Sequence, residues 1–185
     1  PGMKTSYIAY RIIEGLAESD DVKLIIPEGS NIWSIDQLIV KAGFAKMGDF
    51  ARQYYLRDGK LFPDTYRFNE GATIEEVANR FRENYTKKSG SPDIYVLTLA
   101  SLLEREAKKP EDMAVIADII YRRLERGMML QIDATVAYGW CLTRAISRSF
   151  NEYCDVSQAP IVSEIKKDSE FNTYTRHGLP PRPIS

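Results

Sequence analysis

The sequence predicts an α+β fold, and three features along its 185 residues carry that prediction. Two strand–turn–helix units occupy the first half of the chain, a polar linker follows them, and two well-delimited helices come after the linker. With 44% hydrophobic and 28% charged residues, the composition is that of an ordinary soluble globular protein. A chain of this length can bury one sizeable core or two small ones.

The first unit lies within residues 1–44. Apolar residues spaced by four predict a helix over residues 5–16, and an apolar run predicts a strand over residues 22–26. Pro27 and a glycine turn end that strand. A stripe of aliphatic residues then predicts a helix over residues 32–42.

The second unit repeats the pattern of the first. Residues 64–68 look extended, and Thr73 with Glu76 forms a capping-box signature for the helix that follows. Both units share the sequence Glu-Gly-x-x-Ile-x-x-aliphatic, which begins at Glu28 and at Glu70. Any strand–turn–helix junction favours a glycine turn and a cap, so this pattern by itself indicates topology more than function.

The second half of the chain reads as mainly helical. After the linker at residues 87–92, helices are predicted over residues 92–107 and 110–126. Their short connection favours an antiparallel pair. Strict alternation over residues 131–138 predicts an extended segment, and residues 139–171 look irregular.

Composition argues against several functional classes. The net charge of −1 does not suit a dedicated nucleic-acid binder, and one histidine with two cysteines is too few for a zinc site without several carboxylates. A metal enzyme is therefore not expected. No apolar run reaches the roughly 18 residues of a membrane-spanning helix. Cys141 and Cys154 could form a disulfide in an oxidising compartment or remain two free thiols, and spacing does not decide between these.

One carboxylate falls on the apolar face of the helix predicted over residues 92–107. At about 100° per residue, Leu102 and Leu103 help to define that face, and Glu106 follows them on it. Glu104 lies toward its edge. Because a carboxylate in an apolar stripe costs free energy unless it is paired or protonated, Glu106 is either a helix-end residue emerging into solvent or a functional acid.

Polar side chains gather in two later segments. The alternation puts Gln131, Asp133 and Thr135 on one side of an extended segment, and Asn172 and Tyr174 stand just before a proline-rich end. Amide, carboxylate, hydroxyl and aromatic groups are what a sugar-binding groove needs. They are equally typical of an exposed strand face or a polar loop.

Four ordered blocks of this sequence resemble a known family. They are Phe-Pro-Asp-Thr-Tyr from Phe62, Leu-Ala-Ser-Leu-Leu-Glu-Arg-Glu ending at Glu106, Gln-Ile-Asp-Ala-Thr-Val-Ala-Tyr-Gly from Gln131, and Phe-Asn-Thr-Tyr from Phe171 with its Gly-Leu-Pro-Pro-Arg-Pro-Ile ending. Together they resemble the endolytic murein transglycosylases, a family of peptidoglycan lytic transglycosylases. The Pro-Glu-Gly turn and Ile-Trp-Ser-Ile sequence at residues 27–35 resemble a LysM glycan-binding module.

The resemblance implies a LysM-like glycan-binding part at residues 1–44 and a transglycosylase catalytic domain at residues 45–185. It implies a lyase that cuts nascent glycan strands internally and leaves 1,6-anhydro-N-acetylmuramic acid ends without a cofactor. Glu106 matches the catalytic glutamate, which acts first as general acid and then as base. A substrate groove is expected from these matching positions: Gln131, Asp133, Thr135, Tyr138, Asn172 and Tyr174.

The resemblance also implies a location and partners. Family members are held in the inner membrane by one N-terminal helix, so we expect an extracytoplasmic catalytic part whose anchor is absent from this chain. Peptidoglycan strands and the cell-wall synthesis machinery are the expected partners. Three residues depart from the family pattern: Ala107 stands for threonine, Ala134 for proline and Arg182 for glycine.

Two other functions remain open at this point. A glycoside hydrolase could pair Glu106 with Asp64 or Asp133, because most hydrolases of this kind use two carboxyl groups. A non-catalytic peptidoglycan-binding module is the other alternative, favoured by the LysM-like unit and by the altered residue after Glu106.

Overall fold

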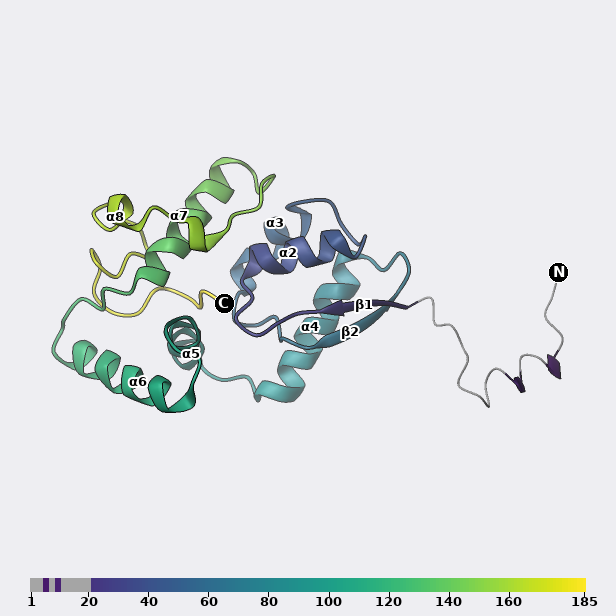
Figure 1. Ribbon diagram of the computed structural model, residues 1–185, viewed down its shortest axis with the longest axis horizontal. Coiled ribbons are helices and arrows are strands. Elements are labelled where there is room, and N and C mark those ends of the chain that lie inside the picture. Colours follow the sequence, from purple (N-terminus) through teal and green to yellow (C-terminus); the bar gives the residue numbers. More distant parts are fainter. Residues whose placement is uncertain (1–4, 7–8, 11–20) are drawn as a thin grey trace.

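The computed structural model describes residues 5–6, 9–10 and 21–185. Most of the helix predicted over residues 5–16 therefore lies outside the described residues. Figure 1 shows two groups of elements: α2, α3 and α4 surround a small sheet, and α5 to α8 form the second group. The C-terminus lies between the two groups.

The sheet pairs two strands that lie far apart in sequence. Leu24 stands directly opposite Tyr66, which follows it by 42 residues. β1 (Asp21–Ile25) runs antiparallel to β2 (Thr65–Asn69). Both strands lie within one residue of their predicted positions. The sheet joins residues on the two sides of the predicted boundary at residue 44. A two-stranded sheet is marginal in water by itself, so it depends on the helices packed against it.

Two helices of the first group begin at side-chain caps, of which the sequence predicted the second. In α2 (Ile32–Lys41), the Asn31 side chain accepts a hydrogen bond from the Ser34 amide at 3.0 Å. In α4 (Ile74–Ser89), Thr73 and Glu76 form the predicted capping box. Each cap satisfies backbone amides that a helix start leaves without partners.

A third helix, α3 (Asp49–Tyr54), was not predicted because its apolar residues show little periodicity. It is followed by a 3-10 turn, Tyr55–Arg57. The buried Asp36 carboxylate of α2 accepts hydrogen bonds from the amides of Gly48, Phe50 and Ala51 at 2.8–3.1 Å. A side chain from another element thus caps α3, which sequence periodicity cannot reveal.

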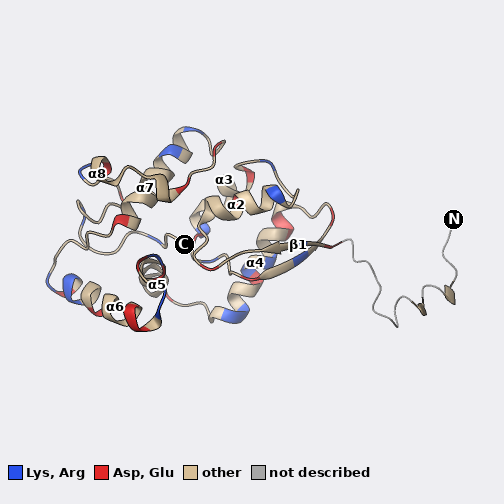
Figure 2. Cartoon of the chain, in the orientation of Figure 1, with Lys and Arg blue, Asp and Glu red and all other residues tan. Residues whose placement is uncertain are grey.

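The second group starts with the two predicted helices, α5 (Ile94–Glu106) and α6 (Pro110–Glu125). The expectation that they run antiparallel is wrong: Figure 1 shows α5 end-on while α6 lies across the view, so they cross steeply. The linking residues Ala107 and Lys109 are extended and redirect the chain. Acidic residues at the first turn of α6 and basic residues at its end complement the helix dipole (Figure 2).

The extended segment predicted over residues 131–138 is also wrong, because α7 (Asp133–Ser147) begins there. Five consecutive residues of α7, from Thr135 to Gly139, are buried. A helix buried on several sides has no clean apolar stripe, and its threonine, valine and tyrosine residues favour strands by propensity. Tertiary burial therefore overrides the local signal. The stretch predicted as irregular, residues 139–171, also holds a 3-10 turn (Val156–Gln158) and the short α8 (Ile161–Glu164).

One hydrophobic core joins both groups. It contains Phe81 and Trp33 from the first group and Leu102, Tyr138 and Phe171 from the second. A disulfide between Cys141 and Cys154 ties the middle of α7 to the segment that follows it. Among the helices of the described ranges, none has the length and apolar character that crossing a bilayer requires.

Candidate active site

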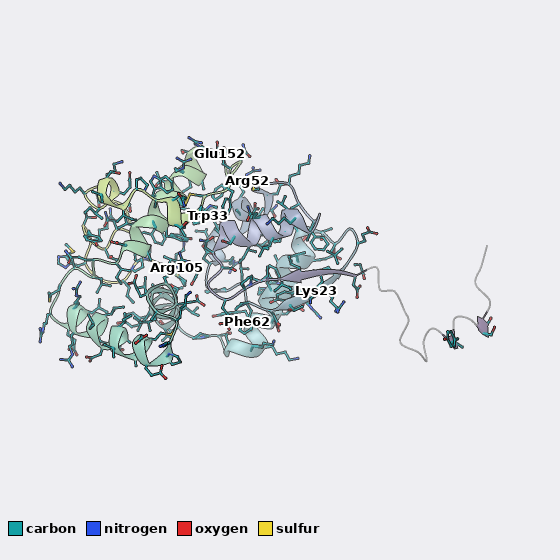
Figure 3. The ribbon with its side chains drawn as sticks, in the orientation of Figure 1. Lys23, Trp33, Arg52, Phe62, Arg105 and Glu152 are labelled. Carbon is teal, nitrogen blue, oxygen red and sulfur yellow. A yellow bond between two sulfur atoms is a disulfide. The ribbon has the colours of Figure 1, made fainter. Side chains whose placement is uncertain are left out.

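Glu106 is the last residue of α5, and its side chain is exposed. Arg105, labelled on α5 in Figure 3, marks this end of the helix. The surrounding protein raises the pKa of the Glu106 carboxyl, mainly because it removes water from around the charged form. The Asp133 carboxylate raises it further, while Arg105 lowers it. The exposed place at the end of α5 fits the first alternative from the sequence, a helix-end residue, and the raised pKa is the direction that the second, a functional acid, requires.

Asp133 and Tyr174 form a direct pair beside Glu106. Asp133 is the first residue of α7, and the Tyr174 hydroxyl donates to its Oδ1 at 2.6 Å. This hydrogen bond raises the pKa of Tyr174 to about 12, and the charges of Asp133 and Glu106 add to the effect. We call these three residues, Glu106, Asp133 and Tyr174, the acid cluster. Its members come from three segments that lie far apart in sequence.

Two hydrogen bonds from backbone amides hold the segment before Asp133 against the segment that carries Tyr174. The amide of Gln131 donates to the Thr173 carbonyl at 3.0 Å, and the amide of Ile132 donates to Thr173 Oγ1 at 2.9 Å. Arg123 of α6 donates to the Leu130 carbonyl at 2.7 Å. The loop before α7 is therefore fixed from both sides. Gln131 is exposed and has a positive φ of 56°, which turns it away from the helix that follows.

Three residues predicted for the substrate groove lie inside the protein instead. Thr135 is fully buried and shares a 2.9 Å hydrogen bond with Thr173. Asn172 is 1% exposed, and its amide nitrogen donates to three backbone carbonyls between residues 164 and 167. Tyr138 is also 1% exposed and donates to Asp58 at 2.6 Å. The bonds of Thr135 and Asn172 fix the segments that carry Asp133 and Tyr174, whereas the Tyr138 bond ties α7 to Asp58. The alternation argument could not distinguish the buried Thr135 and Tyr138 from exposed residues.

A cleft of about 470 Å³ lies on another side of α5. Its walls include the Pro27–Ser30 turn, Phe62, Leu103 and Glu104. The Glu104 carboxylate accepts a 2.6 Å hydrogen bond from the Ser185 hydroxyl and faces the turn at Gly29. Glu104 therefore lines a cavity, although the sequence placed it at a helix edge. The two glutamates are two residues apart and so point to different sides of α5.

Asp64, the other carboxylate considered for a paired mechanism, is engaged elsewhere. Lys88 Nζ lies 2.5 Å from its Oδ2, and Asn84 donates to the same oxygen at 2.6 Å. These contacts lower the pKa of Asp64 to about 2. A carboxylate so stabilised in its charged form is poorly suited to exchange protons near neutral pH.

Comparison with known proteins identifies the family and the fold of this chain. The sequence matches the YceG-like family along residues 1–185. The chain belongs to the YceG-like family. A crystal structure of a YceG-like protein from Listeria monocytogenes superposes on the whole of this chain and on 69% of its own, with a TM-score of 0.67 and 26% sequence identity. The family fold is therefore shared across the chain.

Curated relatives from this family include two endolytic murein transglycosylases. The protein from Bacillus subtilis (strain 168) is 33% identical over 139 residues, which make up 69% of this chain and 35% of the relative. The protein from Streptococcus pneumoniae serotype 2 is 31% identical over 140 residues, which make up 70% of this chain and 24% of the relative. The aligned region thus spans only a quarter to a third of these relatives.

Proposed function

We propose that this chain carries the catalytic part of an endolytic lytic transglycosylase that cuts peptidoglycan glycan strands. The observation that carries the proposal is an exposed Glu106 whose pKa is raised, held beside Asp133 and Tyr174 in a chain of the YceG-like family. Relatives named as endolytic murein transglycosylases support the substrate class.

In the proposed reaction, Glu106 serves as acid and then as base. The protonated carboxyl donates its proton to the glycosidic oxygen as the bond from that oxygen to C1 of N-acetylmuramic acid breaks. The hydroxyl on C6 of the same sugar attacks C1, and the Glu106 carboxylate takes the hydroxyl proton. The products are a 1,6-anhydro end and a free hydroxyl on the leaving strand. Glu106 regains its proton, and no water is consumed.

Asp133 and Tyr174 support this reaction through charge and hydrogen bonding. Desolvation raises the pKa of Glu106, and the Asp133 carboxylate raises it further, which favours the protonated form that the reaction needs. The 2.6 Å hydrogen bond from Tyr174 fixes Asp133 at the start of α7. Gln131, exposed in the adjoining loop, is the proposed contact to the sugar amide or hydroxyl groups.

The LysM-like part is proposed to hold the glycan. Its Pro27–Ser30 turn forms one wall of the 470 Å³ cleft, and α5 forms the facing wall through residues such as Leu103. Apolar walls with a few polar groups suit the amphipathic faces of a sugar chain. A strand bound here would lie along the same helix that ends at Glu106.

We further propose that the protein acts on the outer side of the inner membrane, anchored by a part of the whole protein beyond this chain. The disulfide between Cys141 and Cys154 supports an oxidising compartment. Peptidoglycan strands are the proposed partner, together with the cell-wall synthesis machinery that produces them.

The test uses the matched pair Glu106→Gln and Glu104→Gln with uncrosslinked glycan strands, and product ends are identified by mass spectrometry. We expect anhydro ends from the unaltered protein and a loss of about 10²- to 10⁴-fold in cleavage for Glu106→Gln, as for removal of a general acid. Glu104→Gln changes a wall of the proposed glycan cleft, so its KM should rise while kcat stays close to that of the unaltered protein. If Glu104→Gln loses cleavage and Glu106→Gln keeps it, the catalytic assignment is wrong.

The same assay distinguishes the alternatives. Reducing ends would indicate a hydrolase that pairs Glu106 with Asp133, a pairing favoured by the electrostatic effect of Asp133 on Glu106. Intact strands that sediment with the protein would indicate a wall-binding module. Either result would overturn the proposed lytic reaction.

A further inference from the structure

Three buried side-chain atoms in the described ranges have no hydrogen-bond partner, and they belong to residues grouped around Tyr138. They are Trp33 Nε1, Asp58 Oδ1 and Arg182 Nε. Trp33 points from α2 toward α7 (Figure 3), and its ring lies 5.0 Å from that of Tyr138. Because a buried polar atom without a partner costs free energy, this cluster would gain from a rearrangement that gives its members partners.

Asp58 is the acidic member of this cluster. It follows the 3-10 turn of the first group and is only 2% exposed. One of its oxygens accepts the 2.6 Å hydrogen bond from Tyr138, and the other has no partner. An ionised carboxylate in this position needs a counter-charge, whereas the neutral acid does not.

Among the described residues, Arg182 is the one cation whose charge lowers the pKa of Asp58. Its guanidinium lies over the ring of Phe171 at 4.9 Å and over that of Tyr55 at 5.7 Å. It also lies 3.8 Å from the half-exposed carboxylate of Glu170, too far for a close hydrogen bond. Arg182 therefore lies near a surface carboxylate and also near the buried Asp58–Tyr138 pair, because its charge lowers the pKa of both members of that pair.

We propose that Asp58, Tyr138 and Arg182 form a proton-controlled latch between the first group of elements and the end segment, residues 179–185. When Asp58 is neutral, the Tyr138 hydroxyl keeps its hydrogen bond to the Asp58 carboxyl, and the Arg182 side chain turns outward to pair with Glu170. When Asp58 ionises, Arg182 turns to its free oxygen and fastens the end segment to the first group.

The end segment forms part of the cleft wall, so the latch acts on the cleft. Gly59, next to Asp58, packs so closely on Pro183 that an added Cβ would lie 2.5 Å from the proline ring. The amide of Ile184 donates to Ser101 Oγ at 3.1 Å, and the Ser185 hydroxyl reaches Glu104. A shift of Arg182 would thus be transmitted to the α5 side of the cleft.

The pKa of Asp58 lies in a pH range where the free energy of unfolding can be measured. Burial raises its pKa from 3.8 to about 7, while the Tyr138 hydroxyl, Arg182 and the Ile32 amide lower it. Between these two values the folded protein holds a proton that the unfolded chain releases. The free energy of unfolding should therefore fall as pH rises across this window and level off above it.

The experiment measures urea unfolding from about pH 5 to about pH 8 together with a carbon-13 NMR titration of the Asp58 carboxyl. Asp58→Asn keeps an oxygen that can accept the Tyr138 hydrogen bond. In this variant the slope of the unfolding free energy against pH should fall by the contribution of up to one proton. Removing the cation in Arg182→Gln should move the midpoint to higher pH. Removing the competing carboxylate in Glu170→Gln should move it to lower pH. Amide exchange at Ile184 should slow above the midpoint in the unaltered protein.

The outcomes decide for or against the latch even if a variant folds poorly. An Asp58 carboxyl that does not titrate in the unaltered protein across this range overturns the proposal. So does an Asp58 midpoint that is the same in Glu170→Gln and Arg182→Gln, since a merely structural arginine would leave the proton equilibrium where it is. Exchange at Ile184 that shows no pH dependence beyond intrinsic chemistry rules out transmission to the end segment.

Discussion

Glu104 and Glu106 share a helix and a residue type, yet they meet different surroundings. Glu104 faces the cleft and accepts a hydrogen bond from Ser185, whereas Glu106 lies near a second carboxylate that raises its pKa. A two-residue step on a helix turns a side chain by more than half a circle. The two glutamates therefore differ in chemistry because the helix points their side chains in different directions.

At the residue scale, the acid cluster predicts a pH dependence. Glu106 must be protonated to act as acid, so cleavage should fall as pH rises through its raised pKa. In Asp133→Asn the repulsion from the neighbouring carboxylate is gone, and the alkaline limb of the kcat/KM profile should move to lower pH. The measurement is the rate of anhydro-end formation across the pH range.

Asp118→Asn on α6 is the control for this prediction. Its carboxylate pairs with Arg122 at 2.8 Å on the exposed surface and does not figure in the titration of Glu106. The alkaline limb should stay in place in this variant. An unmoved limb in Asp133→Asn would show that Asp133 does not set the proton affinity of Glu106.

At the element scale, α3 depends on a carboxylate that another helix supplies. In Asp36→Ala, three buried amides at the start of α3 lose their acceptor, and we expect the free energy of unfolding to fall by about 2–3 kcal/mol. Gly48, the cap residue, cannot be replaced to compensate, because an added Cβ would lie 1.8 Å from the Phe150 carbonyl oxygen. Urea unfolding measures the change.

Asp49→Ala tests the same helix from its exposed side. Asp49 lies in the first turn of α3 and makes a 3.8 Å ion pair with Arg52. Because exposed ion pairs and dipole contacts stabilise weakly, the loss should stay below about 1 kcal/mol. Equal losses in the two variants would contradict the capping role of Asp36.

At the scale of the whole molecule, the disulfide stabilises the second group of elements. Replacing both Cys141 and Cys154 by serine should lower the free energy of unfolding by about 3 kcal/mol, as expected for a short closed loop. A reducing agent should lower the stability of the unaltered protein to a similar degree and leave the double variant unchanged. A reducing agent that destabilises both proteins alike would argue against this disulfide.

Local sequence signals predicted most of the elements that bound the cleft. Both strands, the capped helices α2 and α4, and the helix ending at Glu106 follow from turn residues, caps and apolar spacing, which act over a few neighbouring residues. The four blocks that carry the family resemblance lie within residues 1–185, the range over which the sequence matches the YceG-like family. These features depend on short-range physics or on motif order, and both can be read along the chain.

Tertiary structure alone decided which polar residues are exposed and what surrounds them. Thr135, Tyr138 and Asn172 belong to matching motifs, but long-range contacts bury their side chains. The capping of α3 by Asp36 and the hydrogen bond between Asp133 and Tyr174 join residues 12 or more positions apart. Propensity and periodicity describe a residue's own turn or strand, whereas burial and partners depend on segments that only folding brings together.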